Sequence, residues 1–408
     1  MRILLVNKFL YPNGGSETYV FELGKYLTAQ GHQVEYFGME HPNRCVGNSA
    51  NAYTSTMDFH AASGLKKLTY AYRTIYSKEA RQKLRLVLDS FQPEVVHLNN
   101  FNYQLTPSLI VEVLQYRKDT GKPCALVYTA HDFQLICPNH ALFDQQGRVC
   151  ERCLGTKKGR FLPCVKGKCI HGSTIRSVLG FLEATYWNGR SIYEHLDAII
   201  CPSKFMKQKL DTNPVLARKT VFLRNFSAKP AAKGDTLSIE GLPEKYVLYF
   251  GRFSEEKGMG TLLKAAQALP KVPFVAAGSG PLEGELVKAP NIQNVGFQSG
   301  GALVGLIEKA AFSVIPSEWF ENCPYSIIES LMLGTPVLGA RIGGIPELID
   351  DGRTGELFES GNAADLTAKI AALWENEGRY SQYRRNCLNT KFDGIEEYAG
   401  KLLKIYAQ

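Results

Sequence analysis

The stretch PSEWFENCPYSIIESLMLGTPVLGARIGGIPE, residues 316–347, decides the fold of this chain. A polar and aromatic loop leads to Pro324, whose missing amide hydrogen suits the first turn of a helix. That helix is expected to end at Gly334, a usual left-handed stop, and an apolar strand over 336–340 follows. A glycine pair then precedes Pro346, which is expected to open another helix. Alternating strands and helices of this kind are typical of α/β proteins.

The start of the first predicted helix is a candidate ligand site. Backbone amides around residues 322–325 have no partner inside the helix, and the positive end of the helix dipole points outward. Such a terminus suits an anion or a hydroxyl-rich ligand. Glu321 lies just before the helix, and Glu329 lies about one and a half turns inside it. In the plain structural alternative, Glu321 only caps the helix and Glu329 is solvated.

This stretch resembles the E-x7-E signature of retaining glycosyltransferases of family 4. The shared features are Glu-Asn-Cys-Pro at the opening, Gly-Thr-Pro-Val-Leu after the helix and Ile-Gly-Gly-Ile-Pro-Glu at the end. The resemblance implies an α/β fold of the GT-B type, with two Rossmann-like doubly wound domains facing across a cleft. It also implies that Glu321 binds the donor sugar and Glu329 the ribose hydroxyls. The other donor-binding positions implied are Asn322, Cys323, Pro324 and Tyr325.

The composition is that of an ordinary globular protein. A length of 408 residues favours two or three domains, and 45% hydrophobic with 21% charged residues is typical of such domains. No apolar run approaches the roughly 20 residues that span a bilayer. Residues 1–7, MRILLVN, resemble a buried strand more than a secretory signal. We therefore expect a cytoplasmic protein.

The net charge of +8 is concentrated in two segments. Residues 66–85 hold seven Lys and Arg against Glu79 alone, with three tyrosines between them, and residues 148–176 are similarly basic. Such a face suits an anionic membrane surface, although a solvated helix face is the plain alternative. No nucleic-acid motif accompanies the charge, so no nucleic-acid partner is expected. We expect a peripheral location on the inner face of the membrane and a carbohydrate or lipid-linked acceptor.

The first half of the chain opens with a strand, a glycine loop and a helix. Gly14 and Gly15 let the backbone approach a ligand closely, but they do not form a dinucleotide fingerprint, so no nicotinamide cofactor is implied. His131 follows a predicted strand over 125–129, where ligands of open α/β sheets collect. In the family, the matching glycine and histidine border the diphosphate and the donor sugar. A tight turn and a structural histidine are the alternatives.

The second half contains GRFSEEKG, residues 251–258, after a predicted strand. Arg252 and Lys257 supply positive charge, and the flanking glycines let the backbone close in. In the family their equivalents hold the diphosphate as it leaves, and the base lies near the position of Phe297. A surface charge pair is the alternative. The resemblance implies a same-face reaction assisted by the leaving phosphate, with no catalytic metal. The catalytic residues implied are Glu321, His131, Arg252 and Lys257.

Half of the ten cysteines fall within residues 137–169. Cys150 and Cys153 have the Cys-x2-Cys spacing of a zinc knuckle, and disulfides are not expected in a reducing compartment. A subset of family 4 enzymes is similar here, which implies Cys137, Cys150, Cys153 and Cys169 as ligands. Spacing alone would equally allow Cys164 in place of Cys137. We expect a structural zinc, because four protein ligands leave no open position.

We expect a first domain over 1–225 with a cysteine-rich loop at 137–172, and a nucleotide-sugar domain over 245–385. The linker is expected over 226–244, and a last helix over 386–408 that crosses back onto the first domain. The expected activity is a retaining hexosyl transfer from a UDP- or GDP-sugar to an acceptor hydroxyl, in surface polysaccharide or glycoconjugate assembly. The alternatives are a nucleotide-sugar epimerase of the same fold and a non-catalytic nucleotide-sugar-binding subunit.

Overall fold

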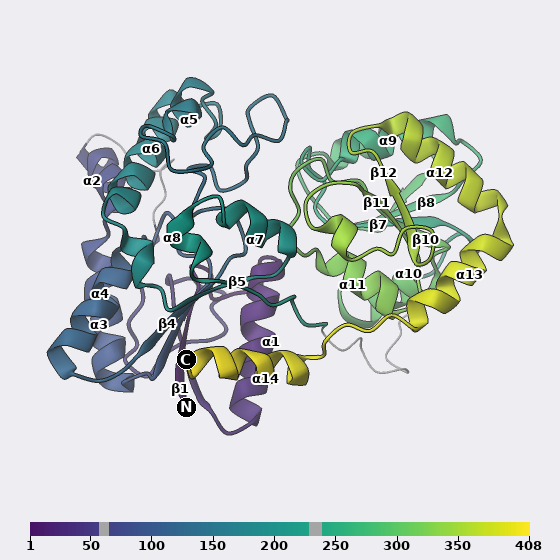
Figure 1. Cartoon of the computed structure of the whole chain (residues 1–408). Helices are drawn as coiled ribbons and strands as arrows, with labels where there is room; N and C mark the ends of the chain where they lie inside the picture. Colours follow the sequence, from purple (N-terminus) through teal and green to yellow (C-terminus); the bar gives the residue numbers. More distant parts are fainter. Residues whose placement is uncertain (57–64, 228–238) are drawn as a thin grey trace. The chain divides into compact units, whose positions relative to one another are not determined.

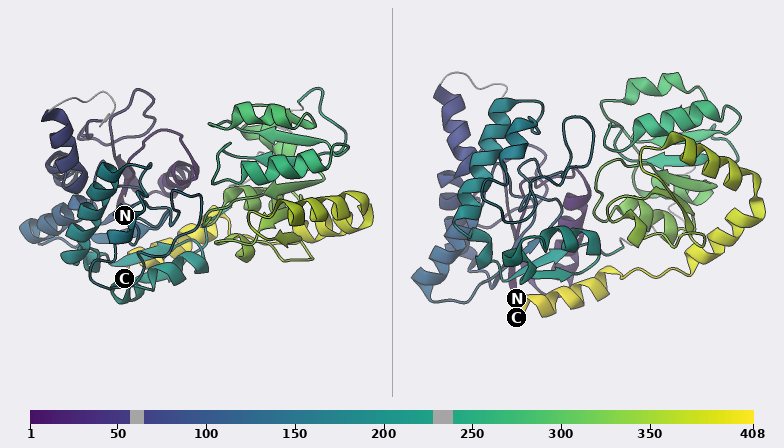
Figure 2. Two further views of the ribbon diagram at one scale, coloured as in Figure 1. Left: turned by 90° about the horizontal axis from the view of Figure 1, so that it is seen from above. Right: turned by 45° about the horizontal axis from the view of Figure 1, so that its top comes forward.

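The computed structural model describes residues 1–56, 65–227 and 239–408, with the backbone alone for 65–69. Its internal contacts divide the chain into two compact units, each described here by itself (Figures 1 and 2). The first unit consists of Met1–Gln145, Cys150–Asn225 and Ile395–Gln408, and the second of Phe226–Gly394 with Gln146–Val149.

The first unit is built on a six-stranded parallel sheet of order β2-β1-β3-β4-β5-β6. Its strands are short apolar runs buried between helices on both faces, as parallel sheets require (Figure 1). The strands are β1 (Arg2–Val6), β2 (Gln33–Phe37), β3 (Val95–Leu98), β4 (Ala125–Thr129), β5 (Ala198–Cys201) and β6 (Thr220–Phe222). The helices are α1 (Gly15–Ala29), α2 (Leu65–Ile75), α3 (Lys78–Phe91), α4 (Ser108–Thr120), α5 (Leu162–Lys166), α6 (Thr174–Gly189), η1 (Ile192–His195), α7 (Lys204–Leu210), α8 (Pro214–Ala217) and α14 (Ile395–Tyr406).

The second unit repeats the architecture with a six-stranded parallel sheet of order β12-β11-β10-β7-β8-β9. Its strands are β7 (Val247–Phe250), β8 (Phe274–Ala277), β9 (Ile292–Asn294), β10 (Phe312–Ile315), β11 (Val337–Ala340) and β12 (Gly355–Phe358). The helical segments are α9 (Met259–Ala268), η2 (Glu283–Lys288), α10 (Gly300–Lys309), α11 (Tyr325–Met332), η3 (Ile345–Glu347), α12 (Ala363–Glu375) and α13 (Glu377–Leu388).

Each sheet reverses its strand order at one place. In the first unit this is between β1 and β3, and in the second between β7 and β10. At such a switch point the connections leave in opposite directions, so a crevice opens beyond the carboxyl ends of the two strands. The loops after these four strands are therefore the places where the fold is suited to hold ligands.

Several element boundaries differ from the sequence prediction. The residue pattern over 60–91 predicts one helical stretch, of which 60–64 lie outside the described residues. Residues 65–91 form two helices, because Ser77 is extended and its side chain caps α3 at the amide of Ala80. Pro346 opens only the short helix η3, and the last helix begins at Ile395 instead of 386. Strands β9 and β12 were not predicted. Residues 228–238 of the expected linker lie outside the described residues.

Helix α14 packs in the first unit, against α1. The hydroxyl of Tyr398 lies 2.6 Å from that of Tyr19, and the hydroxyl of Tyr406 lies 2.6 Å from Nδ1 of His97. All four side chains are buried. The last helix therefore completes the core beside the β1–β3 switch point.

Candidate active site

An ion pair lies at the switch point of the second unit. Nζ of Lys257, in the loop after β7, is 2.6 Å from Oε1 of Glu321, in the loop after β10. Ser317 donates a hydrogen bond of 2.7 Å to the same carboxylate oxygen. Burial by itself would raise the pKa of Glu321, but Lys257 and these hydrogen bonds hold the pKa below its ordinary value. Glu321 is therefore an anion, and its position is fixed without any ligand.

Two glycines allow these loops to pack closely. Gly258 has φ of +74°, and a Cβ there would lie 1.8 Å from the carbonyl oxygen of Pro316. Gly343 has φ of +58°, and a Cβ there would lie 2.3 Å from the carbonyl oxygen of Glu321. Neither the backbone angle nor the space accommodates a side chain. The glycines of both sequence motifs thus set the position of the Lys257–Glu321 pair.

Arg252 is the second cation at this edge. Its side chain is exposed and makes no ion pair within the part of the chain that the structure describes. Its main-chain carbonyl accepts a 2.6 Å hydrogen bond from Tyr249, which anchors the backbone of the loop. Phe297, in the loop after β9, is 74% exposed. An exposed guanidinium and an exposed ring are groups that a phosphate and a base can contact.

The predicted helix start forms, but its residues have different surroundings. Pro324 is the cap of α11, so Asn322 and Cys323 precede the helix. The side chain of Cys323 is buried in the core of the second unit and Tyr325 packs edge-on against Phe226, with ring centroids 6.4 Å apart. Asn322 is half-buried. Cys323 is therefore able to contact a ligand only through its backbone.

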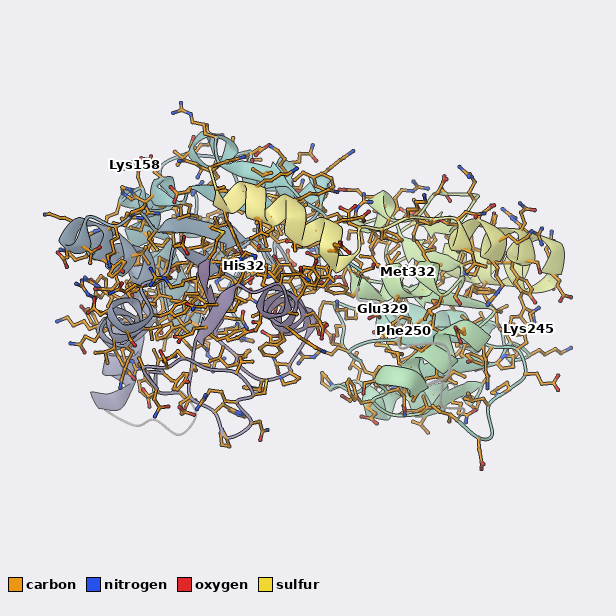
Figure 3. All side chains as sticks on the ribbon, turned by 90° about the horizontal axis from the view of Figure 1, so that it is seen from below. His32, Lys158, Lys245, Phe250, Glu329 and Met332 are labelled. Atoms are coloured by element: carbon orange, nitrogen blue, oxygen red, sulfur yellow. The ribbon has the colours of Figure 1, made fainter. Side chains whose placement is uncertain are left out.

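Glu329 lies inside α11 (Figure 3). Its side chain is half-buried, and among the described residues it has neither a hydrogen bond nor an ion pair. Burial raises the pKa of Glu329 to about 7. A carboxyl group without partners is suited to receive hydrogen bonds from ligand hydroxyls, whereas Glu321 is already held by Lys257 and Ser317.

At the switch point of the first unit, polar side chains from β1 and β3 surround the start of α1. Gly15 is the first residue of this helix. Asn100 donates a 2.8 Å hydrogen bond to the hydroxyl of Ser16, and Asn7 donates one of 2.8 Å to the buried carboxylate of Glu17. The sequence predicted Gly15 as a residue that contacts a ligand, but it did not predict these hydrogen bonds. An asparagine after each of two buried strands was the signal that could have identified them.

His131 follows β4 and is held by Asn99, which follows β3. The amide nitrogen of Asn99 donates to the carbonyls of Val6 and His97, each at 3.3 Å. Oδ1 of Asn99 therefore faces Nε2 of His131, 2.9 Å away, and accepts a hydrogen bond from its N–H. Burial lowers the pKa of His131 to about 3, so the ring is neutral. Its Nδ1 is consequently a hydrogen-bond acceptor.

A buried polar network lies behind His131. Nδ1 of His97 is paired with Tyr406, and its Nε2 lies 2.7 Å from the hydroxyl of Thr129. The ring of Tyr19 packs edge-on against His131, with centroids 5.0 Å apart. Burial lowers the pKa of His97 to about 3, so this ring is neutral as well. A histidine inside the apolar strand at 95–98 was the one sequence signal for this network.

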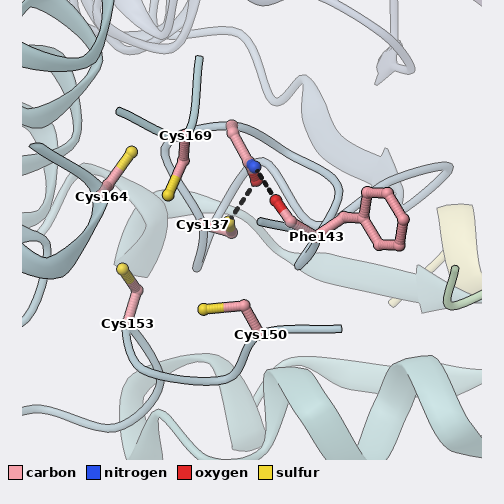
Figure 4. Close-up of a pocket in the computed structure, with 7 residues that line it drawn as sticks. Cys137, Phe143, Cys150, Cys153, Cys164 and Cys169 are labelled. Atoms are coloured by element: carbon pink, nitrogen blue, oxygen red, sulfur yellow. Dashed lines mark hydrogen bonds between the residues drawn. The ribbon is translucent and has the colours of Figure 1, made fainter. Parts of the chain in front are cut away.

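The cysteine-rich loop brings all five predicted cysteines around one small cavity (Figure 4). Sγ of Cys137 donates to Oδ1 of Asn139 at 2.8 Å, and Arg152 donates to Sγ of Cys150 at 3.2 Å. A hydrogen bond from the Cys164 thiol lowers the pKa of Cys169 to about 7. Within the described residues, however, no three His, Cys, Asp or Glu side chains are arranged as a metal site. The thiols converge, and the structure does not show that they bind zinc.

The basic segment at 66–85 carries less unpaired charge than its composition indicates. Arg73 pairs with Glu79 at 2.5 Å, Arg81 with Glu112 at 2.7 Å, and Arg85 with Asp119 at 2.7 Å. The side chains of Lys66 and Lys67 lie outside the described residues. Within the described part of the chain, no helix has the length and apolar character needed to cross a bilayer.

Two family models match the chain. The model for Glycosyltransferase Family 4 matches residues 13–226, more than half of the chain, and the model for glycosyl transferases group 1 matches residues 238–389. The chain belongs to Glycosyltransferase Family 4. The family 4 match thus falls almost wholly in the first unit of this glycosyltransferase, and the group 1 match falls in the second.

Relatives extend the comparison. An uncharacterized protein of 42.6 kDa in the cps region of Klebsiella pneumoniae is 22% identical, with 85% of this chain and 87% of that protein covered. An uncharacterized glycosyltransferase of Methanocaldococcus jannaschii is 29% identical over 51% of this chain and 58% of its own length. The match thus spans little more than half of the second relative.

Solved structures agree on the fold. The sucrose-phosphate synthase of Thermosynechococcus elongatus superposes with a TM-score of 0.69, 18% identity and coverage of 100% and 98% of the two chains. The HepE protein of Anabaena, in complex with UDP-glucose, gives a TM-score of 0.66, 15% identity and coverage of 100% and 99%. Together with the two parallel sheets, these likenesses confirm the predicted α/β fold of the GT-B type.

Proposed function

We propose that this glycosyltransferase is a retaining hexosyltransferase that moves a sugar from a UDP- or GDP-sugar to an acceptor hydroxyl. The observation that carries the proposal is the Lys257–Glu321 ion pair beside the unpaired Arg252, at the switch point of the second unit. A diphosphate needs positive charge near it, and Arg252 and Lys257 are two cations in the same loop, the one after β7. The complexes of the Anabaena protein with UDP and UDP-glucose are consistent with such a donor.

The roles follow from the charge and surroundings of each group. Arg252 and Lys257 neutralise the diphosphate and stabilise the charge that develops on it as the sugar leaves. Glu321 holds Lys257 in place and contacts the donor sugar, whereas Glu329 accepts hydrogen bonds from the ribose hydroxyls. The base lies near Phe297, and the backbone of residues 322–325 contacts the diphosphate. No metal is needed to supply this positive charge.

Residues of the first unit are assigned to the donor sugar and its phosphates. Gly15 exposes the backbone amides at the start of α1, which suit a phosphate oxygen. His131 presents a neutral ring whose Nδ1 accepts a hydrogen bond from a sugar hydroxyl. A neutral acceptor favours a hydroxyl over an anion, so we assign His131 to the sugar. The leaving phosphate takes the proton of the attacking acceptor hydroxyl, because no described side chain is placed here as a general base.

We propose an acceptor linked to lipid at an anionic membrane surface, in the assembly of a surface polysaccharide or glycoconjugate. The relative from Klebsiella pneumoniae supports this assignment, because its name places it in the cps region. The basic composition of the first unit also supports it, although the arginines of segment 66–85 are paired.

We also propose a structural zinc in the cysteine cluster, held by Cys137, Cys150, Cys153 and Cys169 or with Cys164 in place of Cys137. The donor set suits zinc, because thiolates from tight loops are its usual structural ligands. Elemental analysis of the reduced full chain is expected to give about one zinc per chain. Cys150→Ser with Cys153→Ser should lose the metal and lower Tm, whereas Cys124→Ser, at a buried cysteine outside the cluster, should keep the metal. Metal-free reduced protein would contradict the proposal.

The first experiment is a thermal-shift panel of UDP, GDP and ADP with their common sugars. Binding to the folded state raises Tm by mass action, so one nucleotide should stand out and its shift should be lost in Arg252→Ala. The matching donor is then incubated with candidate acceptors, and the product is analysed by NMR for retention at the anomeric carbon. Release of an epimerised sugar would instead indicate an epimerase. Binding without any turnover would indicate a nucleotide-sugar-binding subunit.

A further inference from the structure

Helix α6 has an unusual exposed face. Its most exposed large side chains are Ile175 at 76%, Leu182 at 44% and Val178 at 36%. These residues are spaced by three and four along the helix, so they form one stripe. The other exposed positions of the helix are Thr174, Thr185 and Gly189, none of which is charged. A helix on the surface of a protein in water usually has charged residues on this face.

The inward face of α6 has the opposite character. Glu183, its only acidic residue, is 2% exposed, and Ser177 is fully buried. Helix α5 packs against α6 (Figure 1), and its Leu162 is also apolar and 43% exposed. We name the exposed Leu162, Ile175, Val178 and Leu182 the α5–α6 apolar surface.

The chain around this surface is strongly basic. Residues 152–182 contain seven Lys and Arg and no Asp or Glu. Lys157, Lys158, Lys166 and Lys168 are exposed, and none of them is in an ion pair within the described residues. Lys158 lies at the periphery of the first unit (Figure 3). In segment 66–85, by contrast, the arginines are neutralised by carboxylates.

We propose that the α5–α6 apolar surface and its four exposed lysines bind the chain to an anionic lipid membrane. Apolar side chains in a stripe enter the boundary between headgroups and acyl chains, and lysines beside them attract the negative headgroups. The four exposed lysines are in no ion pair within the described residues, and residues 152–182 contain no Asp or Glu. An anionic surface is therefore the partner of complementary charge. The function of the surface rests on the proposed lipid-linked acceptor, but the binding itself does not require that the chain transfers sugar.

The test is co-sedimentation of the full chain with vesicles. We expect binding to vesicles of phosphatidylglycerol and phosphatidylcholine, weaker binding at high salt, and none to phosphatidylcholine alone. Ile175→Asp with Leu182→Asp should lower the partition coefficient about tenfold or more. Lys157→Glu with Lys158→Glu should do the same, because each lysine near the surface contributes about fivefold.

Matched controls lie on the second unit. Val287→Asp replaces a side chain that is 82% exposed, and Lys264→Glu with Lys271→Glu reverses two exposed lysines, so both should bind vesicles like the parent chain. The nucleotide thermal shift, measured on every variant, reports folding and donor binding separately from lipid binding. Failure to bind the anionic vesicles, or an equal loss in the controls, would overturn the proposal. If the α5–α6 apolar surface instead binds another protein, the chain should not bind these protein-free vesicles, and that result would also overturn the proposal.

Discussion

The two switch points of this molecule use opposite electrostatics. At the second unit, the groups are ions: Lys257 is paired with the buried carboxylate of Glu321, and Arg252 is unpaired beside them. At the first unit, the two histidines are neutral: burial holds the pKa of both His97 and His131 at about 3. Charge in a buried place is tolerated only when it is paired, whereas neutral rings need only hydrogen bonds. The same sheet topology therefore places an ion pair at one switch point and neutral histidines at the other.

The largest expected effect is the loss of the buried ion pair. Lys257→Ala leaves Glu321 as a buried carboxylate without a cation and should lower the free energy of unfolding by about 3 kcal/mol. Lys257→Met with Glu321→Gln removes both charges and should recover most of that loss. Urea unfolding of the three proteins measures the difference. Equal stabilities for the single and double variants would show that the pair is not the organising contact of this edge.

The second-largest effect is that variants at the two switch points should affect different parts of the donor. Arg252→Ala should weaken nucleotide binding about thirtyfold, because a charge-assisted contact to phosphate is worth about 2 kcal/mol. His131→Ala should leave nucleotide affinity within about twofold and instead lower kcat with the whole donor, since its contact is with the sugar. Calorimetry with the nucleotide and steady-state kinetics with the sugar donor provide the two readouts. A large loss of nucleotide affinity in His131→Ala would remove the contrast between the edges.

The smallest effect is a pH dependence confined to the charged edge. Burial raises the pKa of Glu329 from 4.5 to about 7, and ribose hydroxyls favour its deprotonated form. Affinity should therefore fall about tenfold between pH 8 and pH 6, and Glu329→Gln should remove that part of the dependence. His131 does not titrate in this range.

The same carboxyl group predicts a pH effect on the free protein. A raised pKa means that the folded state binds more protons than the unfolded state between about pH 4.5 and 7, so its contribution to stability falls as pH rises through that window. Glu329→Gln should raise Tm at pH 8 in the absence of ligand. A variant with unchanged Tm at pH 8 would mean that the carboxyl is not strained by burial.

The sequence predicted best what neighbouring residues determine. The strands, the Glu321–Glu329 spacing and the Arg252–Lys257 loop are local patterns, and the structure brings Lys257 and Glu321 together as one site. The sequence could not predict which residue each charged side chain would pair with. That Lys257 contacts Glu321, 64 residues away in sequence, depends on the strand order of the sheet.

Other features could not be predicted because they also depend on contacts between residues that are far apart in the sequence. The basic composition of 66–85 indicated a membrane face, but Arg81 and Arg85 meet carboxylates of α4 that only the folded helices bring near. The exposed stripe of α6 was missed because an apolar period in a helix normally marks a buried face. Its buried Glu183 is the feature that distinguishes this helix, and burial cannot be read from a single sequence.

The contacts of α14 have a consequence for how the chain folds during synthesis. Tyr398 and Tyr406 close a polar network whose other members, Tyr19 and His97, leave the ribosome some three hundred or more residues earlier. The second unit, all of which lies between His97 and Tyr398 in the sequence, is synthesised while Tyr19 and His97 still lack these hydroxyl partners. A growing chain can thus complete its second unit first, and the first unit is completed only when α14 has been made. Synthesis of α14 is therefore a step in the maturation of the first unit.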